Sequence, residues 1–324
     1  MADERFLVTG ALGCIGAWVV RDLIRAGAPT AIFDLASDPR RLRLVMTPDE
    51  LAQVRMLTGD ITDLAAVERA VVESGATHII HLAGLQVPFC KADPALGARV
   101  NVVGTVNVFE AAKRRAVRKV VYASSAAVYG ISEDYPEGPL GHDAPLRPMT
   151  HYGVYKQANE GTARVYWHDD GVPSIGLRPY VVYGPGRDQG LTSSPTTAML
   201  AAALGQPYRI PFGGRFDFQF ADDVAQAFIR AALASYAGAD VFNLHGQVVH
   251  VREIVAALEA AVPESRGQLT FADPPLSFPE AMDDTPLLGV LGALPHTPLA
   301  EGIAATLAVF KQALADGRLA PRLP

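Results

Sequence analysis

The feature that most constrains the fold is a run of glycines near the amino terminus. A short apolar strand is expected over residues 6–8, followed by Gly10, Gly13 and Gly16, three apart, and an apolar helical pattern over 17–26. In such a unit the first glycine permits a tight turn, the second lets the backbone approach a pyrophosphate, and the third allows close helix–strand packing. The pyrophosphate then lies at the positive end of the helix. The stretch predicts a dinucleotide-binding turn.

The end of the next strand indicates which dinucleotide binds. A strand is expected over residues 30–33 and leads directly into Asp34. A carboxylate about twenty residues after the glycines accepts the adenosine ribose hydroxyls and disfavours a 2′-phosphate. NAD is therefore predicted rather than NADP. Arg40 and Arg41 follow closely, so a strict preference stays open.

Strands and helices continue to alternate through the first half of the chain. Apolar strands are expected over residues 54–57, 78–81, 119–122 and 174–177. Such alternation indicates a parallel sheet covered by helices on both faces. Ligands of these sheets bind at the carboxyl ends of the strands. Asp60, the run 81–84 and the pair Ser124 and Ser125 fall at these ends, although a serine pair can also be a simple strand-end turn.

Tyr152 and Lys156 stand four residues apart in an uninterrupted helical pattern. That spacing brings a phenol and an ammonium group to one face of a helix. A nearby cation favours phenolate, so a phenol with a usual pKa of ~10 could act as a base closer to neutrality. Such a base could take the proton of a secondary alcohol while a cofactor takes the hydride. On its own, the pair is a weak signal, and a solvated pair on a helix surface is the more common case.

Length and composition exclude several classes of protein. The 324 residues exceed a typical domain of ~100–200, so two lobes are expected. The net charge is -6 with scattered Lys and Arg, which gives no nucleic-acid surface. No apolar run reaches the ~20 residues of a membrane span, and the first residues carry acids where a secretory signal needs cations and an apolar run. Cys14 and Cys90 form neither a metal pattern nor a disulfide framework. We expect a cytoplasmic protein that binds no metal, nucleic acid or membrane.

Six motifs follow one another along the chain: Gly10-x-x-Gly13-x-x-Gly16, Asp60-Ile61, His81-Leu82-Ala83-Gly84, Asn101-Val-x-Gly104-Thr105-x-Asn107, Ser124-Ser125-x-x-Val128-Tyr129-Gly130 and Tyr152-x-x-x-Lys156-x-x-x-Glu160. In this order they resemble the extended short-chain dehydrogenase/reductase family, the group of nucleotide-sugar epimerases and dehydratases. The resemblance spans most of the chain and is strong through about residue 185. It implies an α/β fold with a Rossmann-type, doubly wound parallel sheet and a smaller, interleaved C-terminal substrate lobe.

The resemblance also implies a division of the chain. Residues 1–180 would form the NAD-binding domain, to which 217–245 would return. Residues 181–216 and 246–324 would form the substrate lobe. In the family, the helices that carry Asn101 and Tyr152 often pack against a second copy, which implies a homodimer.

Individual roles follow from the same resemblance. Tyr152 would be the base, Lys156 would hold the nicotinamide ribose and depress the pKa of Tyr152, and Ser125 would bond the substrate hydroxyl. The residues implied for NAD are Gly10, Gly13, Cys14, Ile15, Gly16, Asp34, Asp60, Ile61, Leu82, Ala83, Gly84, Asn101, Ser124, Tyr152, Lys156 and Tyr180. Those implied for the substrate are Ser125, Gln86, Arg187 and Arg215. His81 is expected to be a hydrogen-bonded strand-end histidine rather than a catalyst.

The second half departs from the nucleotide-sugar pattern at three places. Tyr180 and Val181 stand where those enzymes usually have an Asn that touches the sugar nucleotide. Phe216 replaces the usual Arg, and the run 278–284 lacks the Arg of a further motif. A diphosphate is usually bound by guanidinium groups, because they match its oxygens bidentately. A smaller substrate is therefore expected.

Three arginines remain that could hold a single carboxylate or phosphate: Arg187, Arg209 and Arg215. Each could equally be a surface charge. The sequence thus predicts an NAD-dependent oxidoreductase that removes hydride from a secondary alcohol of a small sugar, sugar acid or polyol. Two alternatives stay open: a nucleotide-sugar epimerase or dehydratase that retains NAD, and an NAD-binding regulatory protein without turnover.

Overall fold

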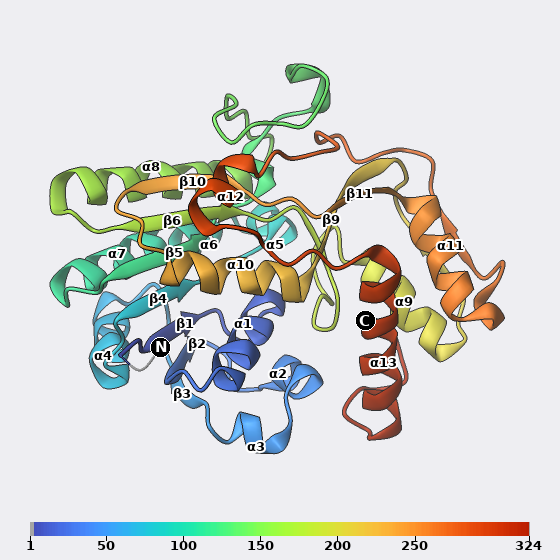
Figure 1. Ribbon diagram of the computed structural model, residues 1–324, viewed down its shortest axis with the longest axis horizontal. Coiled ribbons are helices and arrows are strands. Elements are labelled where there is room, and N and C mark those ends of the chain that lie inside the picture. Colours follow the sequence, from blue (N-terminus) through green and yellow to red (C-terminus); the bar gives the residue numbers. More distant parts are fainter. Residues whose placement is uncertain (1–2, 324) are drawn as a thin grey trace.

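The computed structural model describes residues 3–323 and is built around a seven-stranded sheet (Figure 1). The strand order is β10-β6-β5-β4-β1-β2-β3, and every pairing is parallel. The strands are β1 (Phe6–Thr9), β2 (Thr30–Asp34), β3 (Arg55–Thr58), β4 (His78–His81), β5 (Lys119–Ala123), β6 (Ser174–Arg178) and β10 (Ala239–Asn243). The order reverses between β1 and β4, as in a doubly wound sheet. The predicted Rossmann-type fold is confirmed.

Helices cover both faces of this sheet. On one face, α1 (Cys14–Arg25) packs against α10 (Ala221–Leu233). On the other face lie α4 (Leu64–Ser74), α7 (Gly104–Arg114) and α8 (His151–Asp170), which contact one another in that order. Four short helices complete this half: α2 (Arg40–Val45), α3 (Pro48–Leu51), α5 (Val87–Ala92) and α6 (Pro94–Ala98). A five-residue π-helical turn, Arg99–Val103, precedes α7.

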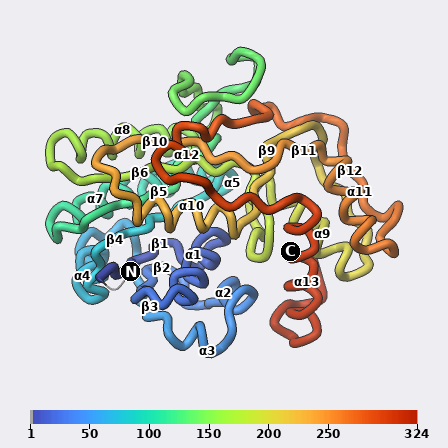
Figure 2. The backbone as a smooth tube through the Cα atoms, in the orientation of Figure 1, coloured from blue at the N-terminus to red at the C-terminus, as the bar shows by residue number. Residues whose placement is uncertain are grey.

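The remaining elements form two small sheets and their helices. One sheet has the order β11-β9-β7, from β7 (Val181–Tyr183), β9 (Arg215–Phe220) and β11 (Gln247–His250). The other pairs β8 (Tyr208–Ile210) with β12 (Leu269–Phe271). The helices are α9 (Ser194–Leu204), α11 (Val251–Ala261), α12 (Thr285–Leu291) and α13 (Leu299–Ala315). Figure 2 follows the chain from β6 to α9, back through β9 and α10, and out again to α11 and α13. The domain boundaries given above stay a prediction.

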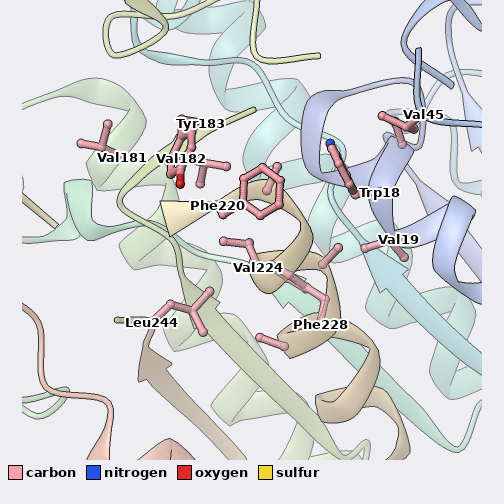
Figure 3. Close-up of a cluster of buried hydrophobic side chains, with 14 of the residues drawn as sticks. Trp18, Val19, Val45, Val181, Val182, Tyr183, Phe220, Val224, Phe228 and Leu244 are labelled. Atoms are coloured by element: carbon pink, nitrogen blue, oxygen red, sulfur yellow. The ribbon is translucent and has the colours of Figure 1, made fainter. Parts of the chain in front are cut away.

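A cluster of large apolar side chains joins the two halves of the chain (Figure 3). Trp18 of α1 meets Phe220 of β9 edge to face, with ring centres 5.4 Å apart. Tyr183 of β7 lies 5.4 Å from Phe220. The indole N–H of Trp18 donates to the carbonyl of Pro185 at 3.0 Å. The chain that follows β7 is thereby fixed against α1, beside the glycine turn.

Two glycines of that turn have no room for a side chain. Gly10 has φ +66°, and a Cβ there would lie 2.4 Å from the nitrogen of Ala83. A Cβ on Gly16 would lie 2.5 Å from the oxygen of Gly10. Both distances are below any real contact, so this packing of turn, helix and neighbouring loop requires glycine at both positions.

Within residues 3–323, no helix is long and apolar enough to cross a bilayer. Cys14 and Cys90 are both free thiols. The cytoplasmic location expected from the sequence stays a prediction.

Candidate active site

A cavity of about 530 Å³ opens at the carboxyl ends of the central strands. It brings together most of the residues implied by the sequence: Gly10, Gly13, Cys14, Ile15, Gly16, Asp34, Asp60, Ile61, Leu82, Ala83, Gly84, Gln86, Ser124, Ser125, Tyr152, Lys156, Tyr180 and Arg187. Asn101 and Arg215 lie outside its lining. The cavity joins the turn expected to bind a dinucleotide with the group expected to do the chemistry.

The amino end of α1 is suited to a pyrophosphate. Gly13 is its N-cap and provides no side-chain hydrogen bond, and no acidic residue stands in the first turn. Cys14, Ile15 and Gly16 line the cavity with this first turn. The first N–H groups of a helix have no partners within the helix and bind anions. This end of α1 therefore fits the diphosphate of NAD.

The carboxylate of Asp34 lies between the glycine turn and the end of β2. Its Oδ2 accepts from the backbone N–H of Leu12 at 3.0 Å, and its Oδ1 accepts from that of Ala36 at 3.2 Å. Asp60 caps the loop after β3, since its Oδ1 accepts from the N–H and the hydroxyl of Thr62, each at 2.8 Å. Both acids line the cavity.

Tyr152 and Lys156 lie in the first turns of α8. Thr150 caps this helix by accepting from the N–H of Gly153 at 3.0 Å. The Lys156 ammonium lies 5.5 Å from the centre of the Tyr152 ring and donates to the carbonyl of Ala123 at 2.7 Å. The phenol of Tyr152 hydrogen-bonds with Ser125. The helix and the end of β5 thus hold a hydroxyl, a phenol and an ammonium group in one cavity.

Burial and charge act in opposite directions on this group. Burial raises the pKa of Tyr152, while the hydrogen bond with Ser125 and the charge of Arg187 act to lower it. Burial lowers the pKa of Lys156 to about 8. The depression of the Tyr152 pKa by Lys156, implied by the family resemblance, stays a prediction.

Asn101 supports the cavity wall from behind. It lies in the π-helical turn, and its Nδ2 donates to the carbonyls of Gly97 at 3.0 Å and Leu85 at 3.2 Å. A Cβ on Gly84 would lie 2.6 Å from its Oδ1. Asn101 therefore fixes the loop after β4 rather than lining the cavity itself.

The His81 ring bridges two hydroxyls, as a hydrogen-bonded strand-end histidine should. Its Nδ1 lies 2.6 Å from the hydroxyl of Thr9, and its Nε2 lies 3.0 Å from that of Thr105. Thr105 donates its own proton to the carbonyl of Asn101 at 2.7 Å, so it accepts from Nε2. Burial, and then the charge of Lys156, lower the pKa of His81 to about 3. The ring is neutral at physiological pH.

The hydroxyl of Ser124 belongs to a buried polar network below the cavity. It donates to Oε1 of Glu160 at 2.5 Å, and Glu160 pairs with Arg178 at 2.7 Å. Arg178 also donates to the phenol oxygen of Tyr129 at 2.6 Å, and Tyr129 donates to Asn243 at 2.7 Å. The network ties α8 to the ends of β6 and β10, and so fixes the helix that carries Tyr152.

Arg215 does not join the other candidates. It begins β9 on an exposed surface, where its Nε lies 3.5 Å from Oε2 of Glu280. Successive side chains of a strand point to opposite faces, and Phe216 is fully buried, so Arg215 points away from the core. The structure therefore places this predicted substrate residue outside the cavity.

Phe278 and most of the loop after β7 are among the parts of the cavity wall that were not identified from the sequence. Phe278 lines it and packs edge-on against Tyr180, with ring centres 6.4 Å apart. The loop after β7 contributes Gly186, Asp188, Gln189, Leu191 and Thr192. The sequence contained a signal for the loop in the close spacing of Gly184, Gly186 and Gly190, and all three have positive φ in the structure. Three such glycines within seven residues mark a tightly folded loop.

The sheet, the glycine turn and the Ser–Tyr–Lys group define an NAD-binding enzyme of the short-chain dehydrogenase/reductase type. Residues 6–244 match the NAD dependent epimerase/dehydratase family, and the chain belongs to it.

The chain is similar in sequence to UDP-glucose 4-epimerases and shares its fold with a dehydrogenase. The UDP-glucose 4-epimerase of Mycolicibacterium smegmatis is 33% identical over 320 residues, which is 95% of this chain and 98% of that protein. The crystal structure of the Thermus thermophilus UDP-glucose 4-epimerase in complex with NAD has a TM-score of 0.82 and 29% identity, covering 96% of this chain and 100% of that one. A partial consensus L-threonine 3-dehydrogenase has a TM-score of 0.84 at 22% identity, covering 95% and 100%, and shows the shared fold.

Proposed function

We propose that the protein is an NAD-dependent oxidoreductase that removes hydride from a secondary alcohol of a small sugar, sugar acid or polyol. The observation that carries the proposal is that Tyr152, Ser125 and Lys156 line the same cavity as the glycine turn. Oxidising an alcohol requires a base for the hydroxyl proton next to an acceptor for the hydride. Bound NAD would supply that acceptor.

Each of the three residues has a distinct role in the proposal. The phenol oxygen of Tyr152 would take the hydroxyl proton, and Ser125 would orient the substrate oxygen. Lys156, charged below a pH of about 8, would hold the nicotinamide ribose and favour the phenolate. A general base of this kind typically contributes about 10²–10⁴ in rate.

Three residues that line the cavity each have a buried polar atom without a partner in the described part of the chain, which supports a small polar substrate. Oε1 of Gln86, the hydroxyl of Tyr180 and Nε of Arg187 are buried without a hydrogen-bond partner among residues 3–323. All three residues line the cavity. Buried polar groups without partners are costly, so a ligand that satisfies them gains affinity. One acceptor, one guanidinium donor and one phenol suit a hydroxylated molecule with a carboxylate.

The second candidate is a nucleotide-sugar epimerase or dehydratase that keeps its NAD. The similarity to UDP-glucose 4-epimerases favours it. Two observations favour a smaller substrate. Arg215 lies outside the cavity, and Phe278 stands in the cavity wall in the segment that lacks the family's arginine. The cavity therefore has fewer guanidinium groups to bind a diphosphate.

The deciding experiment starts with the purified protein. Acid denaturation followed by quantification of released nucleotide measures retained cofactor. An empty protein that reduces added NAD with free sugars or sugar acids would support the proposal. Near-stoichiometric NAD, together with conversion of a UDP-sugar and no net NADH, would replace it with the epimerase. Stable NAD binding without any turnover would indicate a regulatory protein.

We also propose that two copies associate through α8. Val154, Ala158 and Val165 are exposed and share one side of this helix. An apolar helix side of this kind is suited to an interface between copies. Light scattering should give a dimer for the wild type and a monomer for Val165→Glu, whereas a monomeric wild type would contradict the proposal.

A further inference from the structure

The side chains of Arg40 and Arg41, on α2, both pair with one carboxylate from a distant part of the chain. Arg41 donates to Oδ1 of Asp188 through Nε at 3.0 Å and through a terminal nitrogen at 2.6 Å. Arg40 donates to Oδ2 of Asp188 at 3.2 Å. Asp188 lies in the loop after β7, 147 residues from Arg41. One carboxylate therefore engages two guanidinium groups.

This pairing lies directly beside the residue expected to choose between NAD and NADP. Arg41 also donates to the carbonyl of Leu12 at 2.8 Å, while the N–H of Leu12 donates to Asp34. Arg41, Asp34 and Asp188 all line the cavity. Leu12 of the glycine turn is thus bonded through its N–H to Asp34 and through its carbonyl to Arg41. Arg41 in turn pairs with Asp188.

Two arginines at this place would otherwise favour NADP. In dinucleotide-binding units an arginine near the end of the second strand accommodates the 2′-phosphate. Guanidinium forks match phosphate oxygens bidentately. The fork of Arg41 that could face a phosphate is occupied by Asp188.

We propose that Asp188 is a cofactor-specificity residue, which keeps Arg40 and Arg41 from binding a 2′-phosphate. The preference for NAD then rests on two carboxylates from distant parts of the chain. Asp34 repels the 2′-phosphate directly, and Asp188 occupies the guanidinium groups that would bind it. Replacing Asp188 leaves the carboxylate of Asp34 in place, so the variant should gain only part of the affinity for NADP that a dedicated site would have.

The test measures NADH and NADPH binding by fluorescence titration, independently of any substrate. In Asp188→Asn the ratio of NADPH to NADH affinity should rise about tenfold or more, since charged hydrogen bonds to phosphate become available. Asp188→Glu, which keeps the carboxylate, should retain the wild-type ratio. The side chain of Asp188 is 31% exposed, so both variants should fold. Asp188→Ala serves as a second variant, because it removes the carboxylate without introducing an amide that could still bond with the arginines.

Two further variants separate this role from a general effect of charge or of loop anchoring. Asp38→Asn removes the same charge from the pair of Asp38 with Arg43, which also lies on α2. It should leave the ratio unchanged. Adding Arg41→Gln to Asp188→Asn should reverse the gain. If Asp188→Asn and Asp188→Ala weaken both cofactors equally, the loop is merely an anchor and the proposal fails.

Discussion

The ammonium of Lys156 lies 5.5 Å from the centre of the Tyr152 ring and donates a hydrogen bond to the carbonyl of Ala123. One turn of α8 therefore fixes both groups, while the hydrogen bond of Ser125 reaches the phenol from the end of β5. The position of α8 depends on the buried pair of Glu160 with Arg178. The proposed chemistry thus depends on an ion pair, Glu160 with Arg178, that does not itself line the cavity.

Replacing Tyr152 with phenylalanine should remove activity but not cofactor binding. The substitution deletes the proposed base and keeps the ring, so the rate should fall at least about a hundredfold. NADH affinity from fluorescence should change little. Tyr155→Phe is the matched control, because the Tyr155 hydroxyl donates to the carbonyl of Pro94 at 2.8 Å, outside the cavity lining. A Tyr152→Phe enzyme with the wild-type rate would remove this residue from the mechanism.

The buried His81 should make the protein sensitive to acid. The pKa of His81 is about 3 in the folded protein, against an ordinary value of 6.5 that applies to the unfolded chain. Between these two pH values the unfolded chain therefore binds more protons than the folded protein. Stability is full above pH 6.5 and falls as the pH drops towards 3, by up to about 5 kcal/mol. Denaturant unfolding at pH 7 and pH 4 should reveal this loss. His81→Gln should flatten it, and an unchanged slope would mean that other groups dominate.

Removing one charge of the buried ion pair should be costly. Both side chains of Glu160 and Arg178 are almost completely buried, so Glu160→Gln leaves an uncompensated guanidinium. A loss of about 3–5 kcal/mol in the free energy of unfolding is expected. The control is Glu68→Gln. Glu68 pairs with Arg114 at 2.6 Å and with Arg115 at 3.4 Å, both about half exposed, so this change should cost less than about 1 kcal/mol. Equal losses would contradict this account of the network.

Local patterns were sufficient to predict most of the sheet. Runs of apolar residues identify buried strands because both faces of a parallel sheet are covered, and the strand expected at 78–81 matches β4. The start of α1 differs, because Gly13 caps the helix and it begins at Cys14, before the apolar pattern does. Family motifs likewise identified Tyr152 and the residues around it.

Contacts between distant loops could not be predicted in this way. Arg41 pairs with Asp188, although the sequence around each of these charged residues predicts only an exposed surface position. Phe278 enters the cavity wall from a segment noted only for a missing arginine. Arg215 and Arg187 looked equivalent in sequence, yet only Arg187 lines the cavity. Tertiary packing, not local periodicity, decides these positions.

Arg187 should bind an acidic substrate, and Arg187→Gln tests this role. Its Nε is buried without a partner among the described residues, and its terminal nitrogen donates to Thr192 at 3.1 Å. The KM for a sugar acid should rise about tenfold or more, because a charged hydrogen bond is lost. The KM for the corresponding neutral sugar should change much less.

The same substitution should change the pH profile. The charge of Arg187 lowers the pKa of Tyr152, so its removal should move the rise of kcat/KM to higher pH. Arg215→Gln is the matched control, since Arg215 pairs with Glu280 outside the cavity and should leave both KM values and the profile unchanged. Equal effects of Arg187→Gln on acid and neutral substrates, with no change in the profile, would show that Arg187 only supports the loop.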